Sequence, residues 1–188
     1  MSVLMVLWLP IVLSAVIVFV ASSIMHMLLT YHRSDYNKLP DEDKVRAALR
    51  AGNPKPGVYM VPFGTYKEMN SPAMQEKFKE GPVGLLTLAP NGLPGMSKYL
   101  IQWFIYCLLI GYFVAYITAH TLPASAHYPA VFRVAGVTGF MAYGLGHLSN
   151  SIWRRHPWLS TIKEVIDGLV YGLLTAGTFG WLWPFCHR

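Results

Sequence analysis

An uncharged apolar run at residues 3–29 limits the fold of this chain more than any other feature. The run contains no Lys, Arg, Asp or Glu. A helix needs about 20 apolar residues to cross the roughly 30 Å hydrocarbon core of a bilayer. Only 13% of the 188 residues are charged, against about 25% in a typical soluble domain. The sequence therefore predicts an integral membrane protein, in contact with membrane lipids.

Three later segments also have the length and apolar character of spans: residues 99–119, 131–152 and 162–183. With residues 3–29 they predict an all-α membrane protein with four transmembrane helices. The first run is too long for a cleaved signal peptide, and no Lys or Arg precedes it. We therefore expect residues 3–29 to be a membrane helix.

The distribution of Lys and Arg predicts the orientation of these helices. Residues 30–98 contain ten of the chain's 15 basic residues, whereas residues 120–130 contain none. Basic residues favour the cytoplasmic side of a membrane. We therefore expect residues 30–98 to be cytoplasmic and both termini to be periplasmic.

The segment 30–98 is too long for a plain connector and is expected to form a small mixed subdomain. Residues 41–51 and 71–80 have the start and stop signals of short helices. Residues 58–62 and 84–88 have the character of strands that could pair into a small sheet.

Small residues recur at every fourth position of the last predicted span, at Gly168, Gly172, Ala176 and Gly180. Such a ridge lets two helix backbones approach closely in lipid. We expect the third and fourth spans to pack as an antiparallel pair through this ridge.

Ionisable residues inside a membrane are costly, so those in the spans are candidate functional residues. His26, His147 and Asp167 are expected at a similar depth near the cytoplasmic ends of their helices. They could form a packing network, or bind a metal ion or proton. His147 follows Gly144 and Gly146 and could instead ligate a haem or chlorophyll-type ring. No one cofactor is indicated. His32, His127, His156 and His187 are interpreted as surface residues.

Several functional classes lack their sequence signatures. The chain has no phosphate-binding loop, no nucleophile elbow, no His-Glu-x-x-His and no Cys-x-x-Cys. The net charge of +6 follows the membrane-orientation pattern, and no basic stripe interleaved with aromatics predicts nucleic-acid binding.

Four segments resemble a family of small bacterial inner-membrane proteins of unknown function. They are residues 56–62 (PGVYMVP), 81–87 (GPVGLLT), 150–153 (NSIW) and the stretch from Asp167 to Pro184. The resemblance implies a bacterial inner-membrane location and assigns no catalytic residue.

These features favour a non-enzymatic accessory or structural subunit of a larger bacterial inner-membrane assembly, respiratory or photosynthetic, with other membrane subunits as partners. The alternative is a small transporter or a metal- or cofactor-binding membrane protein that uses His26, His147 and Asp167.

Overall fold

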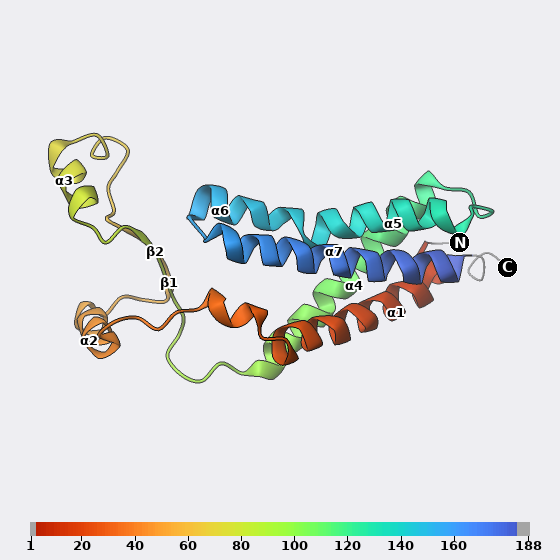
Figure 1. The fold of residues 1–188 in the computed structure, drawn as a ribbon, viewed down its shortest axis with the longest axis horizontal. Helices are drawn as coiled ribbons and strands as arrows, with labels where there is room; N and C mark the ends of the chain where they lie inside the picture. Colours follow the sequence, from red (N-terminus) through yellow and green to blue (C-terminus); the bar gives the residue numbers. More distant parts are fainter. Residues whose placement is uncertain (1–2, 184–188) are drawn as a thin grey trace. The chain divides into compact units, whose positions relative to one another are not determined.

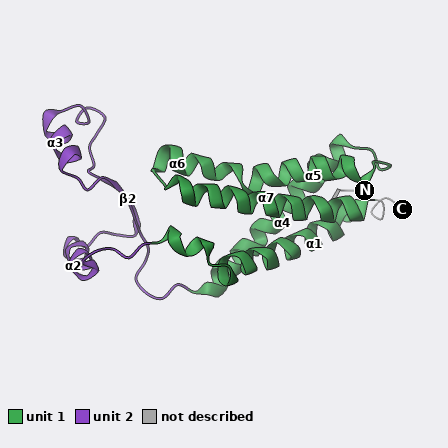
Figure 2. Ribbon diagram, in the orientation of Figure 1, with its two compact units in different colours: residues 1–36, 95–188 green, residues 37–94 purple. Residues whose placement is uncertain are grey.

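The computed structural model describes residues 3–183 and divides into two compact units (Figure 2). The helical unit comprises residues 1–36 and 95–188, and the smaller unit comprises residues 37–94. The residues of each unit contact one another more than they contact the other unit, and the helical unit contains the long helices of the described chain.

Four long helices make the framework of the helical unit: α1 (Val3–Ser23), α4 (Met96–Thr121), α5 (Tyr128–Tyr143) and α7 (Trp158–Leu182). Helix α5 packs along α7, while α1 contacts both α4 and α7 (Figure 1). Shorter pieces extend them: the π-helix η1 (Ile24–Leu28), the 3₁₀ helices η2 (Tyr31–Asp35) and η3 (Leu145–His147), and α6 (Leu148–Arg154).

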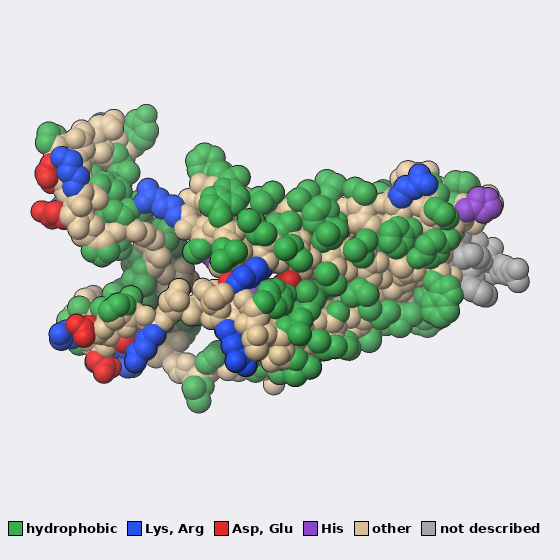
Figure 3. All heavy atoms as spheres, viewed as in Figure 1, with side chains coloured by type: hydrophobic (Ala, Val, Ile, Leu, Met, Phe, Trp, Pro, Cys, Tyr) green, Lys and Arg blue, Asp and Glu red, His purple; other side chains and the backbone are tan. Residues whose placement is uncertain are grey.

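Three helical segments of the described chain are long and apolar enough to cross a membrane: Met5–Leu28, Met96–Thr121 and Trp158–Leu182. Hydrophobic side chains are spread over the visible face of the helical unit (Figure 3). Many large apolar side chains of α1, α4 and α7 are exposed to the surroundings. These features are compatible with a multi-pass membrane protein.

The third expected span, residues 131–152, is not one continuous helix. Helix α5 ends at Tyr143, and Gly144, η3 and α6 follow it. Two glycines, Gly144 and Gly146, lie at this break, and glycine destabilises a helix by about 1 kcal/mol relative to alanine. Four uninterrupted spans are therefore not found.

Helix α1 carries two departures from α-helical geometry. Leu7 has non-helical angles (φ −108°, ψ 17°), three residues before Pro10. Proline removes a backbone hydrogen bond and clashes with the preceding turn, which accounts for the kink. At the other end, the π-helix η1 is closed by Leu29 N–H, which donates to Ile24 O at 3.1 Å.

The backbones of α5 and α7 meet at the small residues of α7. A Cβ atom built on Gly168 would lie 2.3 Å from the Cα atom of Gly144, and one on Gly172 would lie 2.7 Å from the backbone nitrogen of Phe140. A Cβ atom on Gly180 would lie 2.7 Å from the Tyr128 ring. At Gly168 and Gly172, where the nearest atoms belong to the backbone of the facing segment, only glycine permits this approach.

The smaller unit contains the expected two-stranded sheet. Strands β1 (Gly57–Val61) and β2 (Gly84–Leu88) are antiparallel, with Tyr59 opposite Leu86. Helix α2 (Glu42–Gly52) precedes β1, and α3 (Pro72–Glu80) lies between the strands in the chain. The Ser71 hydroxyl accepts a hydrogen bond from Met74 N–H and caps α3.

The boundary between the units differs from the predicted loop at residues 30–98. Residues 30–36 group with the helices, and the smaller unit begins at Asn37. The physical reason is that η2 makes hydrogen bonds to α7. This difference brings the polar side chains of η2, from Tyr31 to Asp35, into the helical unit.

We expect Gly168→Ala to destabilise the helical unit by about 1–3 kcal/mol, the usual range for overpacking. The new methyl group would meet the backbone of α5, which cannot rotate away. Gly177→Ala is the matched control, because its nearest neighbour would lie 3.9 Å away. Thermal unfolding in detergent would measure both variants, and equal melting temperatures for them would contradict this account of the interface.

Candidate metal centre

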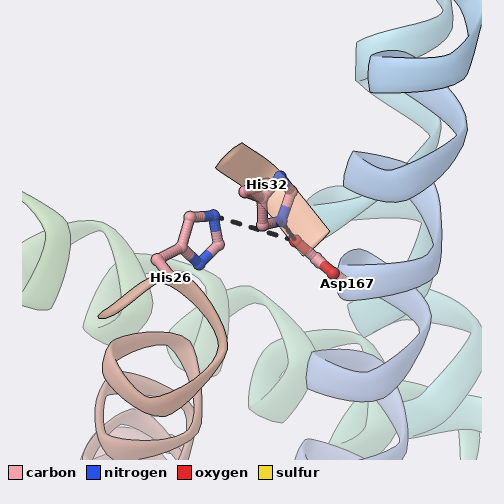
Figure 4. Close-up of side chains that lie close together, drawn as sticks. All are labelled: His26, His32 and Asp167. Carbon is pink, nitrogen blue, oxygen red and sulfur yellow. Dashed lines mark hydrogen bonds and ion pairs between the residues drawn. The ribbon is translucent and has the colours of Figure 1, made fainter. Parts of the chain in front are cut away.

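Polar side chains from three elements meet at one end of the helical unit. His26 comes from η1, His32 from η2 and Asp167 from α7. Figure 4 shows both imidazole rings turned toward the Asp167 carboxylate. One ligand atom of each residue lies within 4.8 Å of those of the other two. These are residue types that bind metal ions in proteins.

Asp167 is the buried centre of this group, with 3% of its surface exposed. Its Oδ1 atom accepts a hydrogen bond from the Tyr31 hydroxyl. Its Oδ2 atom lies 2.7 Å from His32 Nε2 and 3.8 Å from His26 Nε2. A buried carboxylate needs such donors, because burial removes the water that would otherwise solvate its charge.

His32 lies between two carboxylates. Its Nδ1 atom is 2.6 Å from Asp35 Oδ2, and its Nε2 atom is 2.7 Å from Asp167 Oδ2. An imidazole with a proton on only one nitrogen would turn a lone pair toward one of these anions. The arrangement therefore favours a positive charge on His32, carried either by a second proton or by a metal ion on Nε2.

Lys163 and Ser160 hold Asp35 and the rest of η2 against α7. Lys163 Nζ donates to Asp35 Oδ1, Ser34 Oγ and Tyr31 O, each at 2.7 Å. The Ser160 hydroxyl donates to the same Asp35 oxygen at 2.9 Å. A lysine has three donor hydrogens, and all three have acceptors in this segment. The position of His32 is thus fixed from both sides.

Hydrogen bonds also set which nitrogen of His26 is free. Its Nδ1 atom lies 3.1 Å from Ser22 O. A carbonyl oxygen can only accept, so Nδ1 carries the hydrogen, and in neutral His26 the lone pair resides on Nε2. This is the atom directed at Asp167. The ring stacks on that of His32, with centroids 4.5 Å apart.

These contacts shift the pKa values of three side chains of η2. Burial raises the pKa of Asp35, but hydrogen bonds from Lys163, His32 and Ser160 outweigh it and lower the pKa to about 2. Burial lowers the pKa of His32, and its bonds to Asp35 and Asp167 reverse this and raise the pKa above its usual value. Burial and the bond to Asp167 both raise the pKa of Tyr31.

Two of the three spacings between the ligand atoms, those to Asp167 Oδ2, are close to the spacings around a metal ion, and the third is within 4.8 Å. Ligands of a tetrahedral Zn²⁺ at about 2.0–2.1 Å from the metal lie roughly 3.4 Å from one another. The two distances to Asp167 Oδ2, 2.7 and 3.8 Å, bracket this value. Small side-chain shifts would therefore allow the three atoms to bind one ion.

Of the three residues predicted from the sequence, His26 and Asp167 come together and His147 does not join them. His147 Nδ1 lies 3.1 Å from Glu164 Oε2, one turn before Asp167 on α7. His120 contacts Tyr116 O at 2.7 Å. His156 contacts the Thr161 hydroxyl at 3.2 Å. His187 lies outside the described residues.

His32 is the residue that sequence reasoning assigned wrongly to the surface. Its side chain is only 14% exposed. One signal was present: the segment Tyr31-His32-Arg33-Ser34-Asp35 follows an apolar span directly and places a histidine three residues before an aspartate. That spacing brings the two side chains together on a helical turn.

Comparison of the chain with protein family models, with curated proteins and with solved structures finds no match.

We expect the contact of η2 with α7 to be most stable between about pH 4 and pH 6.5, the ordinary pKa values of Asp and His. The raised pKa of His32 means that its contribution is complete below about pH 6.5 and is lost as pH rises through the folded-state pKa. The lowered pKa of Asp35 means that its contribution is complete above about pH 4 and is lost as pH falls toward about 2.

Comparison with His32→Gln would isolate the histidine contribution. The metal-free wild-type protein should melt several degrees higher than the variant near pH 6, and this gap should shrink as the pH is raised to about 9. The groups that face His32 are Asp35, Asp167, Tyr31 and His26. A gap that stays constant over this pH range would show that the charge on His32 does not support the contact.

Proposed function

We propose that this protein binds a divalent first-row transition metal ion through His26, His32 and Asp167. The observation that carries the proposal is the convergence of two imidazole nitrogens and one carboxylate oxygen, from three separate elements, within 4.8 Å. Two histidines and one carboxylate suit ions such as Zn²⁺, Fe²⁺ or Mn²⁺ and leave coordination positions open.

The surroundings of the two histidines support ligation. Metal-binding histidines commonly donate their second ring N–H to a carboxylate or a backbone carbonyl, which fixes the tautomer. His32 Nδ1 lies 2.6 Å from Asp35 Oδ2, and His26 Nδ1 lies 3.1 Å from Ser22 O. Both Nε2 atoms then remain to bind the metal. His147 has a carboxylate partner in Glu164, but among the described residues no third ligand joins this pair.

A proton competes with the metal ion for the Nε2 atom of His32. Without an ion, the imidazolium form of His32 satisfies Asp35 and Asp167 at once. A metal ion that binds Nε2 takes the place of that proton, so metal binding is expected to release a proton and to strengthen as pH rises. The alternative is that His32, Asp35 and Asp167 form a network of ion pairs that binds no metal. Measurement of zinc binding distinguishes the two.

Zinc binding by the full chain in detergent tests the proposal. We expect one Zn²⁺ per chain at pH 7.5, measured by calorimetry and by elemental analysis after desalting. His26→Ala and Asp167→Asn should each weaken binding by at least about tenfold, because each removes a ligand. His26 is about half exposed, so its loss does not leave a deeply buried group without solvent.

His147→Ala is the matched control. His147 also faces a carboxylate of α7, one turn from Asp167, but lies outside the three-residue cluster. Its zinc affinity should equal that of the wild-type protein. The proposal would be overturned by folded wild-type protein without zinc, or by His26→Ala and His147→Ala binding zinc alike.

We further propose four membrane passes, with residues 128–154 as the third pass. Support comes from α5, η3 and α6, which follow α7 along its length. The distribution of basic residues supports a cytoplasmic location for residues 30–98, and the family resemblance supports a bacterial inner membrane. The accessory-subunit function stays a prediction, to be tested by co-purification in mild detergent.

Cysteine labelling of intact cells tests this orientation. A Lys77→Cys/Cys186→Ser double variant should react with a membrane-impermeant maleimide only after the membrane is opened. The wild-type chain, whose Cys186 is expected on the opposite side, should react in intact cells and serves as the control. Labelling of the double variant in intact cells would reverse the proposed orientation.

A further inference from the structure

An apolar groove between α5 and α7 contains one charged side chain. The groove has a volume of about 230 Å³. Its charged residue is Arg133, in the second turn of α5. The other lining residues are apolar: Phe132, Gly136, Val137, Phe140, Leu169 and Leu173. A basic group beside an apolar groove matches a molecule that has an anionic head and an aliphatic tail.

Arg133 has no partner in the part of the chain that the structure describes. The residue is exposed, and no described residue accepts a hydrogen bond from it or forms an ion pair with it. An arginine in a membrane-spanning segment is costly unless an anion or water satisfies its guanidinium group. The inference rests on the proposed third pass, because that pass places Arg133 against lipid.

The acidic side chains of the helical unit are engaged elsewhere. This unit has three of them, Asp35, Glu164 and Asp167, and each already pairs with a lysine or a histidine. The groove lies further along α7, where Gly136 faces Ala176, nine residues beyond Asp167 and roughly 13 Å along the helix axis. By the proposed orientation, the acidic residues of the smaller unit are on the other side of the membrane. A bound molecule is therefore the natural source of the anion.

We propose that this groove binds one anionic phospholipid, with the phosphate on Arg133 and an acyl chain along Gly136 and Leu173. The planar guanidinium group can donate two parallel hydrogen bonds to a phosphate. A zwitterionic lipid would also bring an ammonium group, for which this end of the helix pair offers no described carboxylate. These features favour a lipid of the phosphatidylglycerol class.

Native mass spectrometry of the full chain in detergent, titrated with dioleoylphosphatidylglycerol, tests the proposal. We expect saturable binding of one lipid per chain. Arg133→Gln should raise the half-saturating lipid concentration at least about tenfold, because it removes charge-assisted hydrogen bonds to the phosphate. Arg154→Gln is the matched control, since it removes the same charge from another exposed arginine and should bind the lipid like the wild-type chain. Equal affinities of the two variants would overturn the inference.

Two partial lipids separate the head from the tail. Dioleoylglycerol has the acyl chains without the phosphate, and glycerophosphoglycerol has the phosphate without the chains. Each should bind at least about tenfold more weakly than the whole lipid. Dioleoylglycerol that bound as tightly would show a groove for acyl chains alone, and glycerophosphoglycerol that bound as tightly would show a site for a free phosphate. Either result would overturn the inference.

A pair of substitutions on α7 locates the acyl chain. Leu173→Trp would fill part of the groove and should weaken phosphatidylglycerol binding at least about fivefold. Ile162→Trp is the control, because Ile162 is 49% exposed on the same helix, close to the 47% of Leu173, and does not line the groove. Equal lipid affinities in these two variants would place the lipid elsewhere and would also overturn the inference.

A separate measurement tests the third pass. Val137 is 60% exposed on α5. The thiol of a Val137→Cys/Cys186→Ser variant should resist a membrane-impermeant maleimide even in opened membranes, because a thiol surrounded by hydrocarbon does not ionise. Labelling at position 137 would refute the third pass and, with it, the lipid site. A protected position 137 together with equal lipid affinities of Arg133→Gln and Arg154→Gln would retain the pass and refute the lipid site alone.

Discussion

The buried carboxylate of Asp167 is the constraint on which the polar end of the helical unit depends. A carboxylate this deep in α7 needs donors that replace water, and they come from the segment that follows the first span. His32 then needs a second anion, Asp35, and Asp35 needs Lys163. The two negative and two positive charges balance. Removal of one partner of such a buried pair typically costs about 3–5 kcal/mol.

This charge balance explains why a 3₁₀ segment outside the spans belongs to the helical unit. η2 contributes no described residue that is fully buried. Its attachment is polar and comes chiefly from Lys163, Ser160 and Asp167, which recur every three or four residues along α7. The same contacts that hold the segment in place aim His32 Nε2 at Asp167. Stability and the proposed ligation therefore depend on the same groups.

Much of the helical framework could be read from the sequence, because span length and hydrophobicity are local properties. Residues 3–29, 99–119 and 162–183 each coincide largely with a long apolar helix. The break at Gly144 depends on a neighbour, since Gly168 brings the α7 backbone to that point. Of the candidate site, His26 and Asp167 were identified from depth alone. His32 was missed because its burial arises from the return of η2 onto α7, which no local pattern specifies.

The π-helical turn at Ile24–Leu28 has a consequence for the angular position of His26. Successive residues of an α-helix are rotated by about 100° around its axis. One residue fewer in this turn would let it relax to ordinary α-helical winding and would carry the imidazole roughly a quarter of a revolution around the axis. A point substitution preserves that phase, whereas a single-residue deletion loses it. Along these five positions, the number of residues is therefore a stricter requirement than most of their identities.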